Sequence, residues 1–191
     1  MMGTGTEMEE KKWANKVAED LDRRLPQSYR VEAGKRLIYA NEIEGYDDGE
    51  TKYKKMRYET DILVSEIKNQ TWHPRIVIET KVRSITTHDA IVYSQKAESH
   101  KNVHPYLRYG IFIGNAGKET LPGRLFRHGI NFDFMLSWKE YTPKKGEWET
   151  FVDIIKKEIK ASQKLEEIIY DSKNPKRKKY FALHKPLVMK S

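Results

Sequence analysis

Apolar residues recur at helical spacing between Glu9 and Leu25, and Pro26 stops the pattern. The repeating positions are Trp13, Ala14, Val17, Leu21 and Leu25. Because one face of a helix returns about every 3.6 residues, the pattern predicts an amphipathic helix. The segment 29–40, rich in Tyr, Val, Leu and Ile, predicts a strand. The polar segment 44–50, with its Gly and Asp residues, predicts a loop.

The middle of the chain alternates between strand and helix patterns. Two strands, at 58–67 and 75–82, should form a hairpin through a turn at 68–74. A helix at 87–103 and a buried strand at 107–114 follow. Thr86 or Thr87 is the expected cap of the helix, and Pro105 lies just beyond its end. The strand, helix and strand should form a parallel crossover.

The last third of the chain predicts one strand at 131–138 and one long helix. Apolar positions mark the helix, with an interruption near Ser162, at Trp148, Phe151, Val152, Ile155, Ile159, Ile168 and Ile169. This order of elements predicts an α/β fold with a mixed β-sheet flanked by α-helices. At 191 residues the chain fits one domain, which we expect at 1–171, with a basic tail at 172–191.

Composition narrows the classes of protein. The chain is 38% hydrophobic and 34% charged, which is typical of a globular protein, although it is richer in charge than most. It has no cysteine, which excludes disulfides, thiol nucleophiles and zinc sites of the cysteine-containing kinds. It also has no apolar run of membrane-spanning length and no apolar signal core, so we expect a cytoplasmic protein.

The positive charge is concentrated in two places. Of the net charge of +8, seven cations and no acids lie in 172–191, which leaves +1 for the rest of the chain. Such a tail suits phosphate binding, but a solvated end is an equally good interpretation. A second cluster lies directly before Asp61 and is the better candidate for DNA binding; its members are Lys52, Tyr53, Lys54, Lys55, Arg57 and Tyr58.

Three polar side chains interrupt the two apolar strands of the predicted hairpin: Asp61, Glu79 and Lys81. Side chains two apart in a strand share a face, so Glu79 and Lys81 should point the same way. If Asp61 lies opposite Lys81, all three groups come to within about 5–8 Å of one another. On charge types alone, the favoured interpretation is an Asp at a strand start and an ordinary Glu–Lys pair on a solvated sheet face, because Glu-x-Lys is common in charged proteins.

Two carboxylates placed side by side repel each other unless a cation lies between them, and oxygen ligands favour Mg²⁺ or Mn²⁺ over zinc. Such an ion can bind a phosphate and lower the pKa of a bound water. The nearby Lys81 could then stabilise developing negative charge. Phosphodiester hydrolysis uses all of these groups.

The arrangement resembles the PD-(D/E)xK nucleases, whose pattern is an acidic residue at the start of one strand and acidic-x-Lys at the end of the next, followed by a crossover helix. Asp61 and Glu79-Thr80-Lys81 match this pattern, while Thr60 stands where that family has its proline. The resemblance implies a catalytic Asp61, Glu79 and Lys81. It also implies Mg²⁺, with Mn²⁺ able to substitute, bound by Asp61, Glu79 and Thr80.

The resemblance suggests two further residues of the site. Glu10 lies on the apolar stripe of the first helix and is our candidate for an additional catalytic acid, although a carboxylate favoured by the helix dipole is the alternative. Gln95 on the crossover helix is a possible accessory residue, or simply a solvent-facing one. Arg124 and Arg127, in a predicted loop at 123–129, are candidates for DNA contacts, with a salt-bridged loop as the alternative.

Among nucleases of this class, a compact chain without helicase motifs is similar to a type II restriction endonuclease, which cuts double-stranded DNA as a homodimer. The helix from Trp148 to Ile169 is the candidate dimer contact, with packing onto its own sheet as the alternative. A structure-specific or repair nuclease, such as a Holliday-junction resolvase, would use the same chemistry. In a third interpretation the chain is a non-catalytic DNA-binding module.

Overall fold

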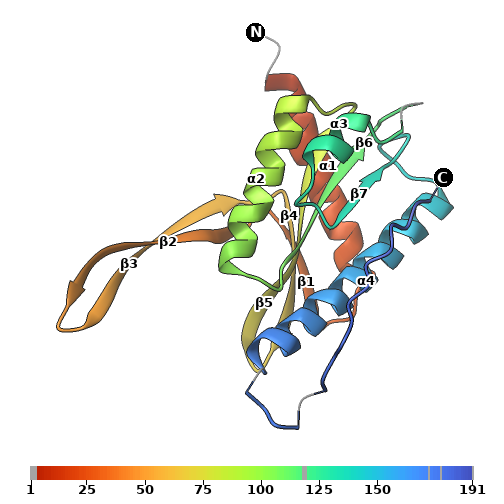
Figure 1. Ribbon diagram of the computed structural model, residues 1–191. Helices are drawn as coiled ribbons and strands as arrows, with labels where there is room; N and C mark the ends of the chain where they lie inside the picture. The colour runs from red at the N-terminus through yellow and green to blue at the C-terminus, as the bar shows by residue number, and fades with distance from the viewer. Residues whose placement is uncertain (1–3, 118–119, 172, 177, 191) are drawn as a thin grey trace.

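The computed structural model describes residues 4–117, 120–171, 173–176 and 178–190. In chain order the elements of this part are α1 (Thr4–Asp22), β1 (Tyr29–Ala33), β2 (Arg36–Asp47), β3 (Glu50–Glu59), β4 (Ile62–Lys68), β5 (Thr71–Val82), α2 (Thr87–Val103), β6 (Arg108–Gly114), α3 (Gly123–His128), β7 (Phe134–Ser137) and α4 (Lys145–Tyr170). The predicted α/β class is confirmed: the helices pack against a mixed sheet (Figure 1).

The sheet has five strands in the order β1-β4-β5-β6-β7. The β1–β4 and β4–β5 pairs are antiparallel, whereas β5–β6 and β6–β7 are parallel. The predicted crossover is confirmed, because α2 connects the parallel strands β5 and β6. Its predicted cap is also confirmed: Thr86 Oγ1 accepts a hydrogen bond from the Asp89 backbone N–H.

The alternation of side chains along β4 and β5 divides the core between the two faces of the sheet. Ile62 and Ile78 pack on the side of α1 and α4, whereas Leu63 and Val77 pack on the side of α2. Both faces are therefore covered, which explains the nearly continuous apolar run in β5. Odd-numbered positions near the end of β5, including Glu79, point toward the α2 side.

The hairpin of β4 and β5 forms, but with a tighter turn and a different register from those predicted. Its turn is Asn69–Gln70, both with positive φ, rather than the whole of 68–74. Ile62 pairs with Ile78, so Asp61 is level with Glu79 and not with Lys81. Asp61 itself lies just before β4, and its side chain reaches across to the Thr80 backbone N–H of β5.

The predicted strand at 29–40 and loop at 44–50 are both wrong in extent. Gly34, with φ +69°, separates β1 from β2, and β2 then continues to Asp47. Asp48 and Gly49, with φ of 47° and 88°, form the tight turn into β3. A left-handed Asp-Gly pair is the preferred connection of a two-residue hairpin. The resulting two-stranded hairpin, residues 36–59, is called the β arm below; it projects from the body (Figure 1).

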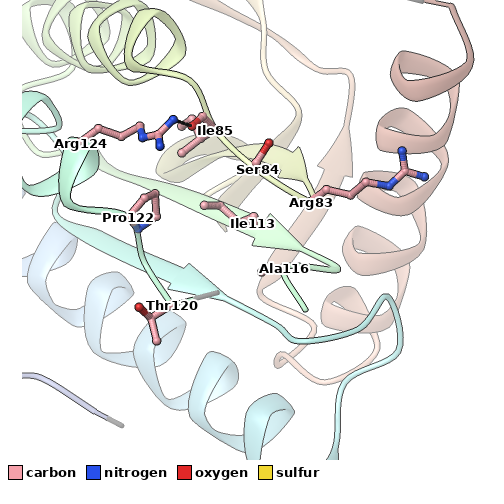
Figure 2. Close-up of a pocket in the computed structure, with 8 residues that line it drawn as sticks. All are labelled: Arg83, Ser84, Ile85, Ile113, Ala116, Thr120, Pro122 and Arg124. Carbon is pink, nitrogen blue, oxygen red and sulfur yellow. Dashed lines mark hydrogen bonds between the residues drawn. The ribbon is translucent and has the colours of Figure 1, made fainter. Parts of the chain in front are cut away.

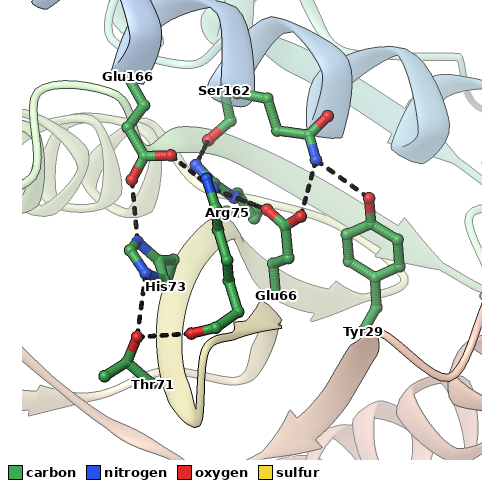
Figure 3. A network of polar contacts seen from close by, with 9 residues as sticks. Tyr29, Glu66, Thr71, His73, Arg75, Ser162 and Glu166 are labelled. Carbon is green, nitrogen blue, oxygen red and sulfur yellow. Dashed lines mark hydrogen bonds and ion pairs between the residues drawn. The ribbon is translucent and has the colours of Figure 1, made fainter. Parts of the chain in front are cut away.

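The predicted loop at 123–129 is wrong as well, because Gly123–His128 form the short helix α3. By contrast, the interruption near Ser162 does not break α4, which is continuous from Lys145 to Tyr170. Ser162 is fully buried, and its hydroxyl accepts a hydrogen bond of 3.4 Å from Arg75 Nη1. A small polar residue thus leaves room for a guanidinium between the helix and the sheet (Figure 3).

Arg75 is the centre of a buried polar cluster that the sequence did not indicate (Figure 3). Its side chain is only 1% exposed, and its Nη2 lies 2.7 Å from carboxylate oxygens of both Glu66 and Glu166. Glu166 also lies 2.9 Å from His73 Nδ1. These contacts connect α4 to the β4–β5 hairpin. They lie near the start of β5, at the other end of the sheet from Glu79.

The chain after α4 runs back alongside that helix (Figure 1). Residues 173–176 and 178–190 form no helix or strand, and Lys190 Nζ lies 3.5 Å from Asp153 Oδ2. Among the helices of the described residues, none has the length and apolar character needed to cross a membrane.

Candidate active site

The predicted site residues come from three separate elements. Asp61 lies between the end of β3 and the start of β4, Glu79 and Lys81 lie near the end of β5, and Glu10 lies in α1. The antiparallel β4–β5 pair brings the beginning of one strand beside the end of the other. These four residues, from three segments that are far apart in the chain, meet at one end of the sheet.

Asp61 is fixed by the strand that it faces. Its Oδ2 accepts a hydrogen bond of 2.7 Å from the Thr80 backbone N–H and one of 3.0 Å from Thr80 Oγ1. The carboxylate thus continues the hydrogen bonding of β5 beyond the last β4 pair, Ile62 with Ile78. This is a structural role for Oδ2, and it leaves Oδ1 as the oxygen available to a ligand.

Glu79 is a carboxylate buried to 1% exposure. Its Oε1 accepts hydrogen bonds from Tyr109 Oη at 2.5 Å and from Lys96 Nζ at 2.9 Å. Burial, followed by the nearby negative charge of Asp61, raises the pKa of Glu79 to about 6. The carboxylate is therefore held in a site where an additional cation would stabilise its charged form.

Lys81 pairs with the acid from the first helix, because its Nζ lies 3.2 Å from Glu10 Oε1. Its Nζ also lies 5.2 Å from the centre of the Tyr93 ring. Burial alone would lower the pKa of Lys81, but Tyr93 and Glu10 outweigh it and raise that pKa. For the carboxyl group of Glu10 burial acts in the other direction and raises the pKa, although Lys81 opposes that change. Lys81 is consequently a fixed cation at neutral pH.

The helix α2 contributes Lys96 and Tyr93 to this cluster, and not Gln95. Gln95 is exposed, and its Nε2 donates a hydrogen bond of 2.9 Å to Glu98 on the same helix. The sequence carried one signal for Lys96: it lies three positions after Tyr93, so that the two residues share a helix face next to the buried Ala97. Tyr109 gave no such signal, because it sits within an apolar strand.

The donor set fits Mg²⁺ or a similar ion. Both hydrogen bonds of Glu79 end on Oε1 and both of Asp61 end on Oδ2, which leaves one oxygen of each carboxylate for a metal. The Thr80 carbonyl points to the same edge of β5 as its N–H, which is the edge where Asp61 lies.

Among the described residues, no three His, Asp or Glu side chains converge as a metal cage. Mg²⁺ does not require one, because it usually binds one or two carboxylates and keeps several waters.

The predicted DNA-binding arginines lie apart from the cluster. Arg124 and Arg127 are exposed on α3, and Arg124 Nη1 donates a hydrogen bond of 2.9 Å to the Ile85 carbonyl. Arg124 lines a cavity of about 20 Å³, which has room for a water molecule and not for a substrate (Figure 2). A wider hollow of about 480 Å³ lies between α1 and α4, and neither hollow is lined by Asp61, Glu79 or Lys81.

Comparison of the sequence with known protein families and with curated proteins finds no match.

Proposed function

We propose that this chain is a Mg²⁺-dependent endonuclease that hydrolyses phosphodiester bonds of double-stranded DNA. The observation that carries the proposal is the position of Asp61 beside Glu79, a buried carboxylate whose pKa is raised by burial and by Asp61, with the cationic Lys81 on the same face. An ordinary pair on a solvated sheet would not bury Glu79. The resemblance to PD-(D/E)xK nucleases agrees with this assignment.

Each residue then has a chemical task. Asp61, Glu79 and the Thr80 carbonyl would hold the ion, which when bound supplies charge neutralisation and Lewis acidity at a phosphate. Lys81 is placed to stabilise negative charge that develops on the phosphate oxygens. Glu10 keeps the ammonium of Lys81 in position through its contact of 3.2 Å.

The test is incubation of the purified protein with supercoiled plasmid in Mg²⁺, in Mn²⁺ and in EDTA. Cleavage that needs the metal is the expected result. A protein that binds DNA but cuts neither plasmid nor branched DNA in either metal would be a non-catalytic DNA-binding module, and the proposal would be wrong. Isothermal titration with Mn²⁺ provides an independent readout, since an inert module should bind no metal at Asp61 and Glu79.

The fragments identify the type of nuclease. We propose a type II restriction endonuclease, for which a plasmid should give discrete fragments whose ends share one sequence. A structure-specific nuclease such as a junction resolvase would leave linear duplexes intact and cut branched DNA. Sequencing the ends produced from mixed-sequence DNA separates these alternatives.

A double-strand break needs two sites, so we propose that the active form is a homodimer. Four large apolar residues of helix α4, the candidate contact, are buried against its own sheet: Trp148, Phe151, Ile155 and Ile159. Apolar side chains near the end of the helix, Ile168 and Tyr170, are exposed, so we propose that end as the contact. Light scattering with and without DNA, combined with a nicking assay, tests the dimer. A monomer that only nicks would exclude the dimer and the restriction enzyme but not the metal-dependent nuclease.

A further inference from the structure

The β arm stands apart from the body of the protein. Among the described strands, β2 and β3 pair only with each other, and most of their side chains beyond Ala40 are exposed. The ten residues of β3 span about 30 Å, which is close to one turn of B-DNA. An isolated two-stranded hairpin has little stability of its own in water. A binding role would explain why the chain has an arm of this length.

The two faces of the arm differ in chemistry. In β3 the odd-numbered residues share one face and the even-numbered residues share the other, and each residue shares its face with its cross-strand partner. We call the first of these the tyrosine face; its exposed members are Asn41, Ile43, Tyr46, Tyr53, Lys55 and Arg57, and at the base of the arm the pair Arg36 and Glu59. The exposed members of the opposite face are Glu42, Asp47, Glu50, Lys52 and Lys54, and at the base of the arm Tyr58.

The two lysines of the opposite face each have an acidic residue on the neighbouring strand. Lys52 Nζ lies 2.9 Å from Asp47 Oδ2, and Lys54 is paired in register with Glu42. On the tyrosine face, Lys55 is paired with Asn41 and Arg57 with Ile38, neither of which is acidic. The four cations that the sequence presented as one cluster are thus separated into two compensated and two uncompensated ones.

The tyrosine face also connects to the candidate active site. Its last member at the base of the arm, Glu59, lies two residues before Asp61. Glu59 Oε1 lies 3.2 Å from Nζ of Lys11, the neighbour of Glu10 on α1. Both faces of the arm therefore begin beside the candidate site, because on the opposite face the centre of the Tyr58 ring lies 5.6 Å from Nζ of Lys96, which bonds Glu79.

We propose that the tyrosine face of the β arm lies in the major groove of duplex DNA. The major groove admits a two-stranded ribbon, and the face offers Arg57 and Lys55 for phosphates or guanine, Asn41 for adenine, and Ile43 for a thymine methyl. Tyr46 and Tyr53, 74% and 57% exposed, add apolar surface and hydroxyl groups. Naming duplex DNA as the ligand rests on the proposed nuclease function.

The experiment measures binding of a fluorescein-labelled, mixed-sequence duplex of about 30 base pairs, roughly three helical turns, by anisotropy in EDTA. The double variant Lys55→Ala/Arg57→Ala is compared with Lys52→Ala/Lys54→Ala, which removes the same charge from the opposite face. We expect the first pair to weaken binding about tenfold or more and to lower the salt slope by about two. The second pair should change binding less than about threefold.

A second variant, Tyr46→Ala/Tyr53→Ala, should weaken binding about tenfold while leaving the salt slope unchanged, because it removes no charge. Equal losses from the two charge pairs, or no loss from either, would overturn the proposal. One further result would overturn the proposal: light scattering shows that the wild type is a dimer and Tyr46→Ala/Tyr53→Ala a monomer, while the two bind DNA equally well. The tyrosine face would then bind a second copy of the chain.

The failure of this inference and that of the nuclease function are distinguishable, because the binding assay contains no catalytic metal. DNA binding through the tyrosine face without cleavage in Mg²⁺ would refute the nuclease and support the arm. If all the arm variants bind and cleave DNA as the wild type does, the proposal that the arm binds DNA is wrong and the nuclease proposal stands.

Discussion

Lys96 Nζ lies 2.9 Å from Glu79 Oε1, so the carboxylate at the end of β5 is neutralised by a lysine of α2 and not by Lys81 two residues away. Lys81 instead pairs with Glu10. Glu79 and Glu10 are thus paired with cations from other elements, whereas Asp61 accepts its hydrogen bonds from Thr80. These two ion pairs connect α1 and α2 to the end of β5, with Lys81 bound to Glu10 and Lys96 bound to Glu79.

The first prediction concerns catalysis. Asp61→Asn, Glu79→Gln and Lys81→Met should each lower the rate of plasmid cleavage in Mg²⁺ by about 100-fold or more, because each removes a charge that the reaction needs. Single-turnover rates at saturating DNA measure the effect. Gln95→Ala is the matched control: it removes an exposed side chain bonded to Glu98 and should cut at nearly the wild-type rate. Wild-type rates in all three charge variants would show that the site is misassigned.

The second prediction concerns pH. Burial and Asp61 raise the pKa of Glu79 from 4.5 to about 6, so folding favours its protonated form. The resulting stabilisation is fully present below pH 4.5 and is lost as the pH rises through 6. The loss amounts to about 2 kcal/mol, at about 1.4 kcal/mol per pKa unit. Metal-free Glu79→Gln should therefore match the wild type at pH 4 and exceed its free energy of unfolding at pH 7.5.

Urea denaturation at the two pH values measures this difference. Added Mg²⁺ should stabilise the wild type more at pH 7.5 than at pH 4, and it should have little effect on Glu79→Gln. Lys96→Met separates the role of the ion pair: it should destabilise the wild type at pH 7.5 but change the Glu79→Gln variant little. A wild type that is more stable than Glu79→Gln at pH 7.5 would show that the ion pair outweighs the burial of the charge.

The third prediction concerns the buried Arg75. Arg75→Met leaves Glu66 and Glu166 without their shared cation and should lower the free energy of unfolding by about 3–5 kcal/mol. Lys157→Met is the control, because its ion pair with Asp153 is exposed and screened by solvent, so its loss should change the free energy of unfolding little. If the Arg75 variant loses no more than this control, the cluster does not stabilise the fold.

The same cluster predicts a sensitivity to acid. Burial alone would raise the pKa of Glu166, but the hydrogen bond from Arg75 outweighs it and lowers that pKa below 4.5. The contribution of Glu166 to stability is therefore present at neutral pH and is lost as the pH falls below 4.5.

The fourth prediction concerns the tail, which carries seven cations in 172–191. Deletion of this segment should weaken DNA binding and flatten its salt dependence without removing sequence preference, because phosphate contacts are independent of sequence. Fluorescence anisotropy at several salt concentrations measures both quantities. A tail in which the seven cations are replaced by Gln should behave like the deletion; an unchanged salt slope in both variants would show that the tail does not contact DNA.

The sequence predicted those parts of the structure whose pattern is local. The two-residue alternation at Glu79 and Lys81, and the cap at Thr86, depend only on neighbouring positions, and both have the predicted geometry. Lys96 and Tyr109 reach Glu79 only through the packing of α2 and β6, which no local pattern contains. The exact register of the hairpin could not be predicted either, because it depends on the geometry of the turn and of the bulge after Val64.

The β arm was missed for a different reason. Alternation of apolar and polar residues marks a strand that buries one face. Beyond its base the arm buries neither face, so the sequence of its strands is as polar as that of a loop. The Asp48-Gly49 pair was the one local signal for a hairpin. Arg75 was missed because a charged residue in an apolar strand carries no indication of its partners on α4.

The arm leaves and rejoins the body at adjacent positions. Ala33 pairs directly with Ile62, and the Gly34 N–H donates a 3.0 Å hydrogen bond to the Thr60 carbonyl. The arm is thus an excursion from the β1–β4 hairpin, and the ends of a shortened or lengthened arm would meet at the same place. Loop length has only a weak effect on closure entropy, so this segment can vary in length at little thermodynamic cost, and it can open locally while the sheet stays folded. If the arm binds DNA as proposed, its binding surface can therefore change, in inheritance and in engineering, without a change at Asp61, Glu79 or Lys81.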